Sequence, residues 1–303
     1  MTVDFLDDVL TVVIPTFNRL DMLKKILDTI PRTIRVIISD NGSSVPDEFV
    51  SFYHDFTFVK TSRLLEPLEN WNNCINLVKT EWFTIPSDDD LYYCNSFELI
   101  AKYLKSDHLS DTLIFGHNVI NETDKVIDSW KPNTYKKMSP PFSYSIFKYG
   151  VDARFPGLIF KKNIVMMNGG FDTSYKITAG DSKLIQQCLL KGTVTFIPEV
   201  LAAYRVWHNN STTLTLGTTE WLNEIDRWQD EILVEAVFFF GIKGIKIDQK
   251  NIKDEVYAKN LIGGILSNKR NSGFIRAVKF INSVRFPWRA KLSTKLRILK
   301  ALF

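Results

Sequence analysis

The first clear strand signal in the chain is TVVIPTFNR, residues 11–19. Its continuous β-branched run ends at Pro15 and a polar turn, which is typical of a short strand buried on both faces. Apolar residues then recur at helical spacing over residues 19–30, and IRVIIS at 34–39 repeats the strand pattern before an Asp-Asn-Gly turn. Strands that alternate with helices predict an α/β fold whose sheet is mainly parallel and flanked by helices.

The same alternation continues along the chain. We expect further strands at 57–61, 82–86, 112–120, 125–130, 157–161 and 194–198, and further helices at 69–78, 95–104 and 181–190. Residues 131–141 are expected to form a polar loop, and from about residue 218 the pattern is wholly helical. Polar residues follow three of the expected strands, and ligands of parallel sheets bind beyond the carboxyl ends of the strands. The sequence therefore predicts a binding site at that edge.

The composition excludes several classes of protein. Of 303 residues, 45% are hydrophobic and 24% charged, which are values of a globular chain and not of a disordered or collagen-like one. No apolar run approaches the length of about 20 residues that a spanning helix needs. The acidic N-terminus does not resemble a secretory signal. Cys74, Cys94 and Cys188 are odd in number and lack metal-type spacing, so we expect neither disulfides nor a cysteine zinc site, and a cytoplasmic compartment.

Charge divides the chain into two parts. Residues 1–255 carry 27 Lys and Arg against 34 Asp and Glu, whereas residues 256–303 carry eleven Lys and Arg and no acidic residue. Two apolar stripes at helical spacing accompany this basic charge, Phe274-Val278-Ile281 and Leu292-Leu296-Leu299-Phe303. Basic amphipathic helices of this kind suit the surface of an anionic membrane. Two alternatives stay open: the stripes pack against the rest of the chain, or they form a homodimer interface. Nucleic-acid binding is not expected, because no reader motif accompanies the charge.

Asp88, Asp89 and Asp90 form the sharpest local feature of the sequence. Three adjacent carboxylates repel one another unless a cation compensates them. Carboxylate oxygens suit Mg²⁺ or Mn²⁺, and Mg²⁺ typically binds one or two carboxylates together with substrate phosphates. The alternative is a solvated acidic turn or a helix cap, where aspartate is also favoured.

Several motifs, taken in order, resemble a known family. They are VIPTFNR at 13–19, ISDNGSS at 38–44, NWNN at 70–73, the aspartate triplet, GGFD at 169–172, Gly180-Asp181, and YRVWH at 204–208 followed by Asn210-Ser211. Their order and spacing are similar to those of family 2 glycosyltransferases with the GT-A fold. The resemblance implies a Rossmann-like, mixed and mainly parallel sheet flanked by helices, to which this chain adds a C-terminal helical extension.

The resemblance also implies a donor that is a nucleotide-activated sugar, with UDP as the first expectation. Pro15, Thr16 and Asn18 would shape the nucleotide pocket. Asp40 would hydrogen-bond the edge of the nucleobase, although it also suits a plain turn. Asn70 would lie near the nucleoside, although it also suits a helix cap.

The same resemblance assigns the acidic triplet and one histidine to a metal site. Asp90 is the expected ligand of Mn²⁺ or Mg²⁺, with Asp88 and Asp89 beside it, and the metal would neutralise the charge of the departing diphosphate. His208 would approach the metal or the diphosphate from the other side, although a lone histidine is often structural.

Asp181 matches the position of the catalytic base of the family. Such a base accepts the proton of the acceptor hydroxyl as that oxygen attacks the anomeric carbon, and in-line attack inverts the configuration. Many relatives carry Glu-Asp where this chain has Gly180-Asp181, and aspartate also suits a helix start. On the acceptor side, the resemblance points to Arg154, and Trp130 can stack on a sugar ring.

Together these features predict an inverting, metal-dependent glycosyltransferase of bacterial O-antigen, capsule or other surface-polysaccharide synthesis. Its acceptor would be a glycan linked to polyprenyl diphosphate, and the protein would attach peripherally to the inner face of the plasma membrane. We expect a catalytic domain over residues 1–215, with a nucleotide-binding half at 1–110 and an acceptor half at 111–215, and a basic helical region at 216–303.

Two other functions compete with this prediction. A sugar nucleotidyltransferase generally needs a glycine-rich phosphate loop, and PTFNRLD at 15–21 contains no glycine. A non-catalytic relative that binds sugar nucleotides or serves as an assembly partner would not need the aspartate triplet and Asp181, both of which are present.

Overall fold

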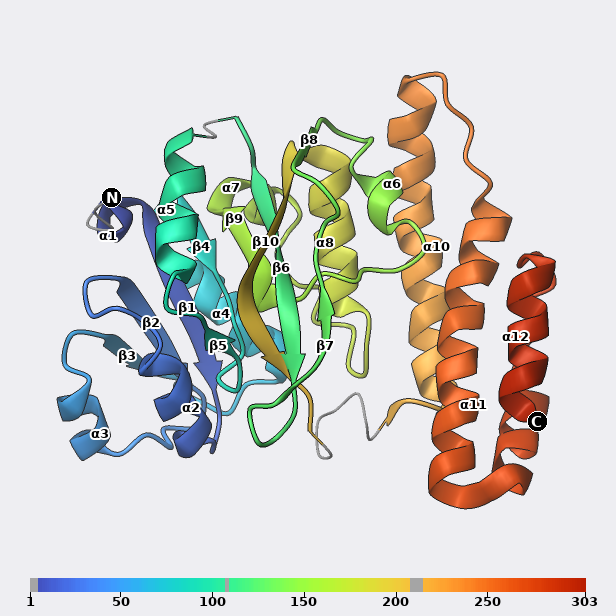
Figure 1. Cartoon of the computed structure of the whole chain (residues 1–303), viewed down its shortest axis with the longest axis horizontal. Coiled ribbons are helices and arrows are strands. Elements are labelled where there is room, and N and C mark those ends of the chain that lie inside the picture. Colours follow the sequence, from blue (N-terminus) through green and yellow to red (C-terminus); the bar gives the residue numbers. More distant parts are fainter. Residues whose placement is uncertain (1–4, 107–108, 208–214) are drawn as a thin grey trace. The chain divides into compact units, whose positions relative to one another are not determined.

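The structure is a computed structural model that describes residues 5–106, 109–207 and 215–303. Figure 1 shows its helices and strands, coloured along the sequence. The chain forms two compact units. The first comprises the chain up to residue 140 together with residues 152–172 and 191–206, and the second comprises residues 141–151, residues 173–190 and the chain from residue 207 onward. These bounds do not coincide with the functional division expected at residue 215, which stays a prediction.

One sheet of ten strands forms the centre of the first unit. Parallel pairs join β1 (Leu10–Thr16) to β2 (Arg35–Asp40) and β4 (Trp82–Thr84), β2 to β3 (Thr57–Lys60), and β6 (Thr112–Ile120) to β10 (Val194–Arg205). Antiparallel pairs add β5 (Leu91–Tyr92), β7 (Val126–Trp130), β8 (Lys136–Met138) and β9 (Leu158–Lys161). The strand order is β3-β2-β1-β4-β9-β6-β10-β5, with β7 beside β6 and β8 beside β10. The mixed sheet confirms the predicted fold class.

Helices cover both faces of this sheet. α2 (Leu20–Leu27) and α5 (Ser96–Ser106) contribute Ile26 and Ile100 to one apolar core with Val12 of β1. Side chains alternate along a strand, so neighbouring residues of β1 point to the opposite face. There α4 (Pro67–Leu77) packs against β1 and β2, and its Trp71 meets Phe155 edge-on. Three shorter helices complete the unit, α1 (Leu6–Val9), α3 (Asp47–Phe52) and α7 (Lys162–Met167).

Three segments of the sheet differ from the sequence prediction. One is the two-residue β5, where no strand was expected. β10 continues past Pro198 to Arg205, beyond the expected end at residue 198. Its register with β6 shifts between Ile197 and Val200, and proline is tolerated at such a bulge because no ladder donor is needed there. β8 lies inside the expected loop 131–141, where its polar sequence gave no strand signal.

The second unit is helical. It holds α6 (Tyr144–Phe147), α8 (Gly180–Lys191) up to residue 190, α10 (Thr219–Ile242), α11 (Gln249–Asn282) and α12 (Leu292–Leu302). α11 is interrupted at Gly273, whose φ of 80° and ψ of 176° are readily adopted by glycine alone. Cys74, Cys94 and Cys188 are free in the structure. Within the described ranges, no helix has both the length and the apolar character needed to cross a membrane.

Candidate active site

The carboxyl ends of β1 and β2 lie level with each other, because Thr16 pairs with Asp40 in the parallel register. β4 ends at Thr84, shortly before the aspartate triplet. The hydroxyl of Thr16 donates a hydrogen bond of 2.7 Å to Asp88 Oδ2, and the Asn41 N–H donates one of 3.0 Å to the Thr16 carbonyl. The structure therefore brings the three predicted polar clusters together at one edge of the sheet.

Arg19 compensates the charge of the triplet. Its guanidinium lies 2.6 Å from Asp88 Oδ1 and 2.8 Å from Asp89 Oδ2. Asp88 is fully buried, and this burial raises its pKa to about 6 despite the opposing effect of Arg19. Arg19 was not among the residues predicted for the site, although three adjacent carboxylates require a nearby cation. That requirement was the signal that could have found it.

Asp90 stabilises the turn through hydrogen bonds to its buried carboxylate. Its Oδ2 accepts a hydrogen bond of 2.9 Å from the Ser87 N–H, and its Oδ1 accepts one of 3.2 Å from the Arg205 N–H. Burial, together with the charge of Asp89, holds the pKa of Asp90 well above its usual range. These contacts differ from those expected of the main metal ligand, because both oxygens of Asp90 are buried and already bind main-chain N–H groups.

A divalent cation fits this site through Asp89. Asp89 keeps 10% of its side chain exposed, whereas the side chain of Asp88 is fully buried. Asp88 Oδ1 is a second oxygen of suitable chemistry, since among the described residues it has no hydrogen bond beyond its ion pair with Arg19. In the same residues no group of three or more His, Cys, Asp or Glu side chains is arranged to hold a metal ion. The donor set therefore fits Mg²⁺ or Mn²⁺ only as one or two carboxylates completed by phosphate oxygens. His208, the other predicted ligand, lies outside the described residues.

Two residues expected near the nucleoside have contacts that stabilise the protein itself. Asp40 is fully buried, and its carboxylate accepts hydrogen bonds from the N–H groups of Ser44 at 2.8 Å and Val45 at 3.1 Å. Asn70 is buried in α4 and accepts a hydrogen bond of 2.6 Å from the hydroxyl of Ser39. Asp40 therefore stabilises a turn and Asn70 joins α4 to β2, while their contacts with a nucleotide stay predictions.

Phe17 and Asn18 form an exposed rim at this edge. Asn18 has a φ of 53°, which asparagine tolerates, so the chain turns sharply after the buried Pro15. Phe17 is 44% exposed, and a Cβ at Gly42 would approach its ring to 3.3 Å. Leu64 faces the same glycine and is 59% exposed. An exposed aromatic ring here offers a flat surface to a nucleobase. The sequence did not reveal this because its residue types do not distinguish an exposed Phe from a buried one.

Trp130 and Arg154 gather around His117 and Tyr204. Trp130 faces His117 in the β6–β7 ladder, with ring centroids 5.7 Å apart. Arg154 lies 5.5 Å from the ring of Tyr204, which in turn lies 6.4 Å from the ring of His117. Burial, reinforced by Arg154, lowers the pKa of His117 to about 4. The structure therefore brings the two predicted acceptor residues into one cluster and adds His117, which the sequence analysis missed.

Asp181 belongs to the second unit, where it is exposed in the first turn of α8. Its Oδ1 accepts a hydrogen bond from the Ser182 N–H. The preceding loop is tied down, because the carboxylate of Glu224 accepts hydrogen bonds from the N–H groups of residues 176–178. Ala179 has a φ of 67°, a strained value for alanine of the kind that clusters at functional sites. This loop fixes the start of α8 and with it the position of Asp181 in the unit.

Sequence comparisons agree with this picture. Residues 11–155 match the model of glycosyl transferase family 2. An uncharacterized glycosyltransferase of Rickettsia typhi is 27% identical over 233 residues, which cover 72% of this chain and 69% of the relative.

Solved structures share the fold over nearly the whole chain. One is S. aureus TarS 1–349 in complex with UDP-GlcNAc, with a TM-score of 0.63 at 16% identity, covering 97% of this chain and 79% of that one. Another is the mannosyltransferase PcManGT from Pyrobaculum calidifontis in complex with GDP-Man and Mn²⁺, with a TM-score of 0.55 at 14% identity, covering 96% and 85%. The motifs, the sheet, the match of residues 11–155 and the glycosyltransferase relative together support a glycosyltransferase of the family 2 type with the GT-A fold.

Proposed function

We propose that the chain transfers a sugar from a nucleoside-diphosphate sugar to a hydroxyl group of a glycan acceptor, with inversion at the anomeric carbon. UDP is the first candidate for the nucleotide. The observation that carries the proposal is the pair Asp88 and Asp89, held by Thr16 and Arg19 at the carboxyl edge of the sheet. The nucleotide sugars bound by TarS and PcManGT give it further support.

On this proposal the donor lies along the rim formed by Phe17 and Asn18. The exposed ring of Phe17 stacks on the nucleobase, and Pro15 and Thr16 shape the floor below it. Asp88 lies on the ribose side. Arg19 keeps the carboxylates of Asp88 and Asp89 side by side, so that little rearrangement is needed when the donor binds.

We assign the divalent cation, Mn²⁺ or Mg²⁺, to Asp89 and the donor diphosphate, with Asp88 as its neighbour. When bound, the cation supplies positive charge that stabilises the departing diphosphate. The Mn²⁺ of PcManGT supports the choice of metal, and the exposed part of the Asp89 side chain supports the choice of ligand. Asp90 then acts on the turn and not on the metal.

Asp181 is proposed as the general base. The acceptor oxygen forms a bond to the anomeric carbon, the bond from that carbon to the diphosphate oxygen breaks, and the hydroxyl proton moves to the carboxylate of Asp181. Attack from the face opposite the leaving group inverts the configuration. The exposed carboxylate at the start of α8 and the strained loop before it support this role.

The acceptor is proposed to meet the cluster of Trp130, Arg154, His117 and Tyr204. An indole ring suits the apolar face of a sugar, and a guanidinium suits a phosphate. A glycan linked to polyprenyl diphosphate presents both groups. We therefore place the protein in bacterial surface-polysaccharide synthesis, attached peripherally to the inner face of the plasma membrane.

A thermal-shift screen with UDP, GDP, dTDP and their sugars, each with and without Mn²⁺, tests the donor assignment. A ligand that binds the native state raises the apparent melting temperature, so one nucleotide is expected to do so in a Mn²⁺-dependent manner. Asp89→Asn should abolish this shift, whereas the exposed control Asp21→Asn should retain it. No shift with any nucleotide would contradict the proposal, and a shift without sugar transfer would favour the non-catalytic alternative.

A further inference from the structure

α12 presents an apolar face to solvent. Four of its apolar side chains lie on one side of the helix and are 69, 50, 47 and 83% exposed, namely Leu292, Leu296, Leu299 and the flanking Phe303. The opposite side holds the buried Thr294, Ile298 and Ala301, where α12 packs against α11. The predicted α12 stripe therefore faces outward, so the packing alternative does not hold for it. In the other predicted stripe, Phe274 is exposed while Val278 and Ile281 are partly buried.

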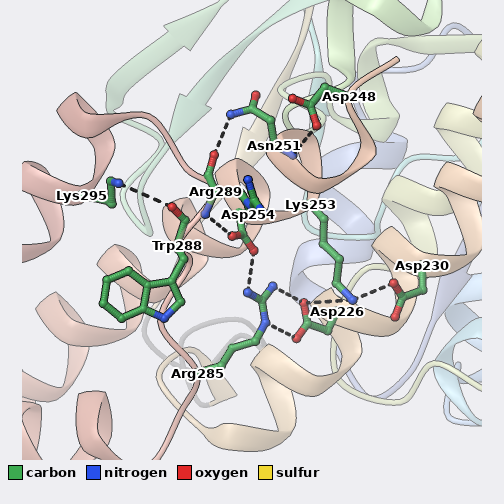
Figure 2. A network of polar contacts seen from close by, with 10 residues as sticks. All are labelled: Asp226, Asp230, Asp248, Asn251, Lys253, Asp254, Arg285, Trp288, Arg289 and Lys295. Atoms are coloured by element: carbon green, nitrogen blue, oxygen red, sulfur yellow. Dashed lines mark hydrogen bonds and ion pairs between the residues drawn. The ribbon is translucent and has the colours of Figure 1, made fainter. Parts of the chain in front are cut away.

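Aromatic side chains extend this surface at both ends. Phe274, just after the interruption of α11, is 47% exposed and lies 6.3 Å from the ring of Phe303. Trp288 is 74% exposed near the start of α12, where its main-chain oxygen faces Lys295 (Figure 2). We call the surface of these two residues and the four apolar residues of the stripe the apolar face.

Basic side chains flank the apolar face. Helical geometry places Lys295 on one side of the α12 stripe and Lys300 on the other. Arg276 and Lys279 are exposed on α11. None of these four has an acidic partner within the part of the chain that the structure describes, and residues 256–303 contain no Asp or Glu. This surface is therefore both apolar and positively charged.

A polar network fixes the connector between α11 and α12 (Figure 2). Asp226 of α10 accepts two hydrogen bonds of 2.7 and 2.8 Å from Arg285, and Asp254 of α11 accepts one of 2.6 Å from the same guanidinium. Asp254 also accepts a hydrogen bond from the Arg289 N–H. The nearby carboxylates are thus bound inside the unit, while the neighbouring Trp288 stays exposed.

We propose that the apolar face and its flanking Lys and Arg residues dock on an anionic lipid bilayer, with α12 lying in the plane of the interface. Its Leu, Phe and Trp side chains enter the boundary between headgroups and acyl chains, and the basic side chains attract anionic headgroups. Charge complementarity favours this occupant over a second copy, since a dimer through this face would bring two wholly basic segments together. The inference deepens the proposed function, because it explains how a lipid-linked acceptor is reached, but vesicle binding needs no catalysis.

Co-sedimentation of the full chain with lipid vesicles tests this proposal. We expect binding to phosphatidylcholine vesicles that contain 25% phosphatidylglycerol, weakened at least tenfold by 0.5 M NaCl or by omitting the anionic lipid. Lys295→Gln with Lys300→Gln should weaken binding about tenfold or more, whereas the matched exposed pair Lys243→Gln with Lys246→Gln should change it less than threefold.

The apolar contribution is tested by a second pair of variants. Trp288→Ser with Phe303→Ser should lower vesicle binding at least tenfold, whereas Val234→Ser with Phe238→Ser, which are 69 and 61% exposed on α10, should leave it unchanged. If a variant does not fold, the proposal is tested by how the vesicle binding of the unmodified chain depends on salt and anionic lipid.

No binding to anionic vesicles, or equal losses in test and control pairs, would overturn the inference. The inference would also be overturned if the unmodified chain bound no vesicles but formed a concentration-dependent dimer that the Trp288→Ser, Phe303→Ser variant does not form. A chain that binds vesicles but transfers no sugar would leave this inference standing and overturn the proposed function, which separates the two failures.

Discussion

Three adjacent aspartates have three different surroundings in this site. Asp88 faces Thr16 and Arg19 in the interior, Asp89 reaches the surface, and Asp90 binds main-chain N–H groups. The sequence predicted the acidic cluster, which the structure confirms, and a divalent cation beside it, which stays a proposal. Residue types alone cannot say which carboxylate points outward. The metal ligand predicted from the resemblance therefore moves, in our proposal, from Asp90 to Asp89.

These different surroundings predict different effects of two substitutions, one on stability and one on metal-dependent binding. Asp90→Ala should lower the free energy of unfolding by about 2–4 kcal/mol, because it leaves two buried N–H groups without acceptors. Asp89→Asn should lower stability less than Asp90→Ala, since Arg19 keeps its ion pair with Asp88, but should abolish the Mn²⁺ dependence of nucleotide binding. Urea denaturation and calorimetry with and without Mn²⁺ measure both effects. Loss of metal dependence in Asp90→Ala alone would return the ligand role to Asp90.

The buried His117 should make the free energy of unfolding depend on pH. Its pKa is lowered to about 4 in the folded chain, so the unfolded chain binds the additional proton between pH 6.5 and 4. The folded state should therefore lose about 2 kcal/mol as the pH falls from 7 to 5, and this loss should disappear in His117→Gln. His54→Gln, at an exposed position, is the control. Urea denaturation at the two pH values measures the difference, and identical pH dependence in wild type and His117→Gln would contradict the burial argument.

Asp181 is predicted to act in the chemical step alone. Asp181→Asn keeps the size of the side chain and its place in α8 but removes the base, so the transfer rate should fall by a factor of about 10² to 10⁴. Donor affinity, measured by calorimetry, should stay within about twofold. A variant that lost donor binding to the same degree as activity would instead place Asp181 in the donor site.

At the scale of the element, the loop before α8 depends on α10. Glu224 accepts hydrogen bonds from three consecutive N–H groups there, which a neutral amide oxygen accepts less strongly. Glu224→Gln should therefore lower kcat about tenfold without changing the donor KM, because the position of Asp181 is loosened. Glu220→Gln, at an exposed position in the first turn of α10, should change neither. A change in donor KM with unchanged kcat would rule out this positioning role.

Helices and strands with a clear hydrophobic periodicity were predictable from the sequence. Strands that depend on pairing with a neighbouring strand were not. Buried β-branched runs gave β1 and β2, and helical spacing gave α2, α4 and α5 within a few residues. β8 was not predicted because an edge strand needs no apolar pattern. The predicted β10 was too short because a proline such as Pro198 usually ends a strand. The spacing in α12 was also correct, but periodicity cannot say which face packs. The structure buries Ile298 and exposes Leu292.

At the scale of the whole molecule, distant segments assemble each unit. Residues 141–151 and 173–190 join the helices that follow residue 207, so a division at one position along the sequence does not reproduce the units. In the first unit, Arg154 and Tyr204 lie near His117 although they are distant from it in the sequence. No local sequence motif predicts this cluster. The order of local motifs predicted the resemblance to family 2 glycosyltransferases and a polar edge of the sheet, whereas such long-range contacts follow only from the folded chain.

The central claim is an inverting transfer from a nucleotide sugar with Asp181 as the base. Proton NMR of the anomeric signal of the first-formed product, followed from the start of the reaction with the donor found in the thermal-shift screen, tests it most directly. Inverting transfer predicts a first-formed product of configuration opposite to that of the donor, and no product within the same time from Asp181→Asn. A product that retains the donor configuration, or undiminished transfer by Asp181→Asn, would contradict it.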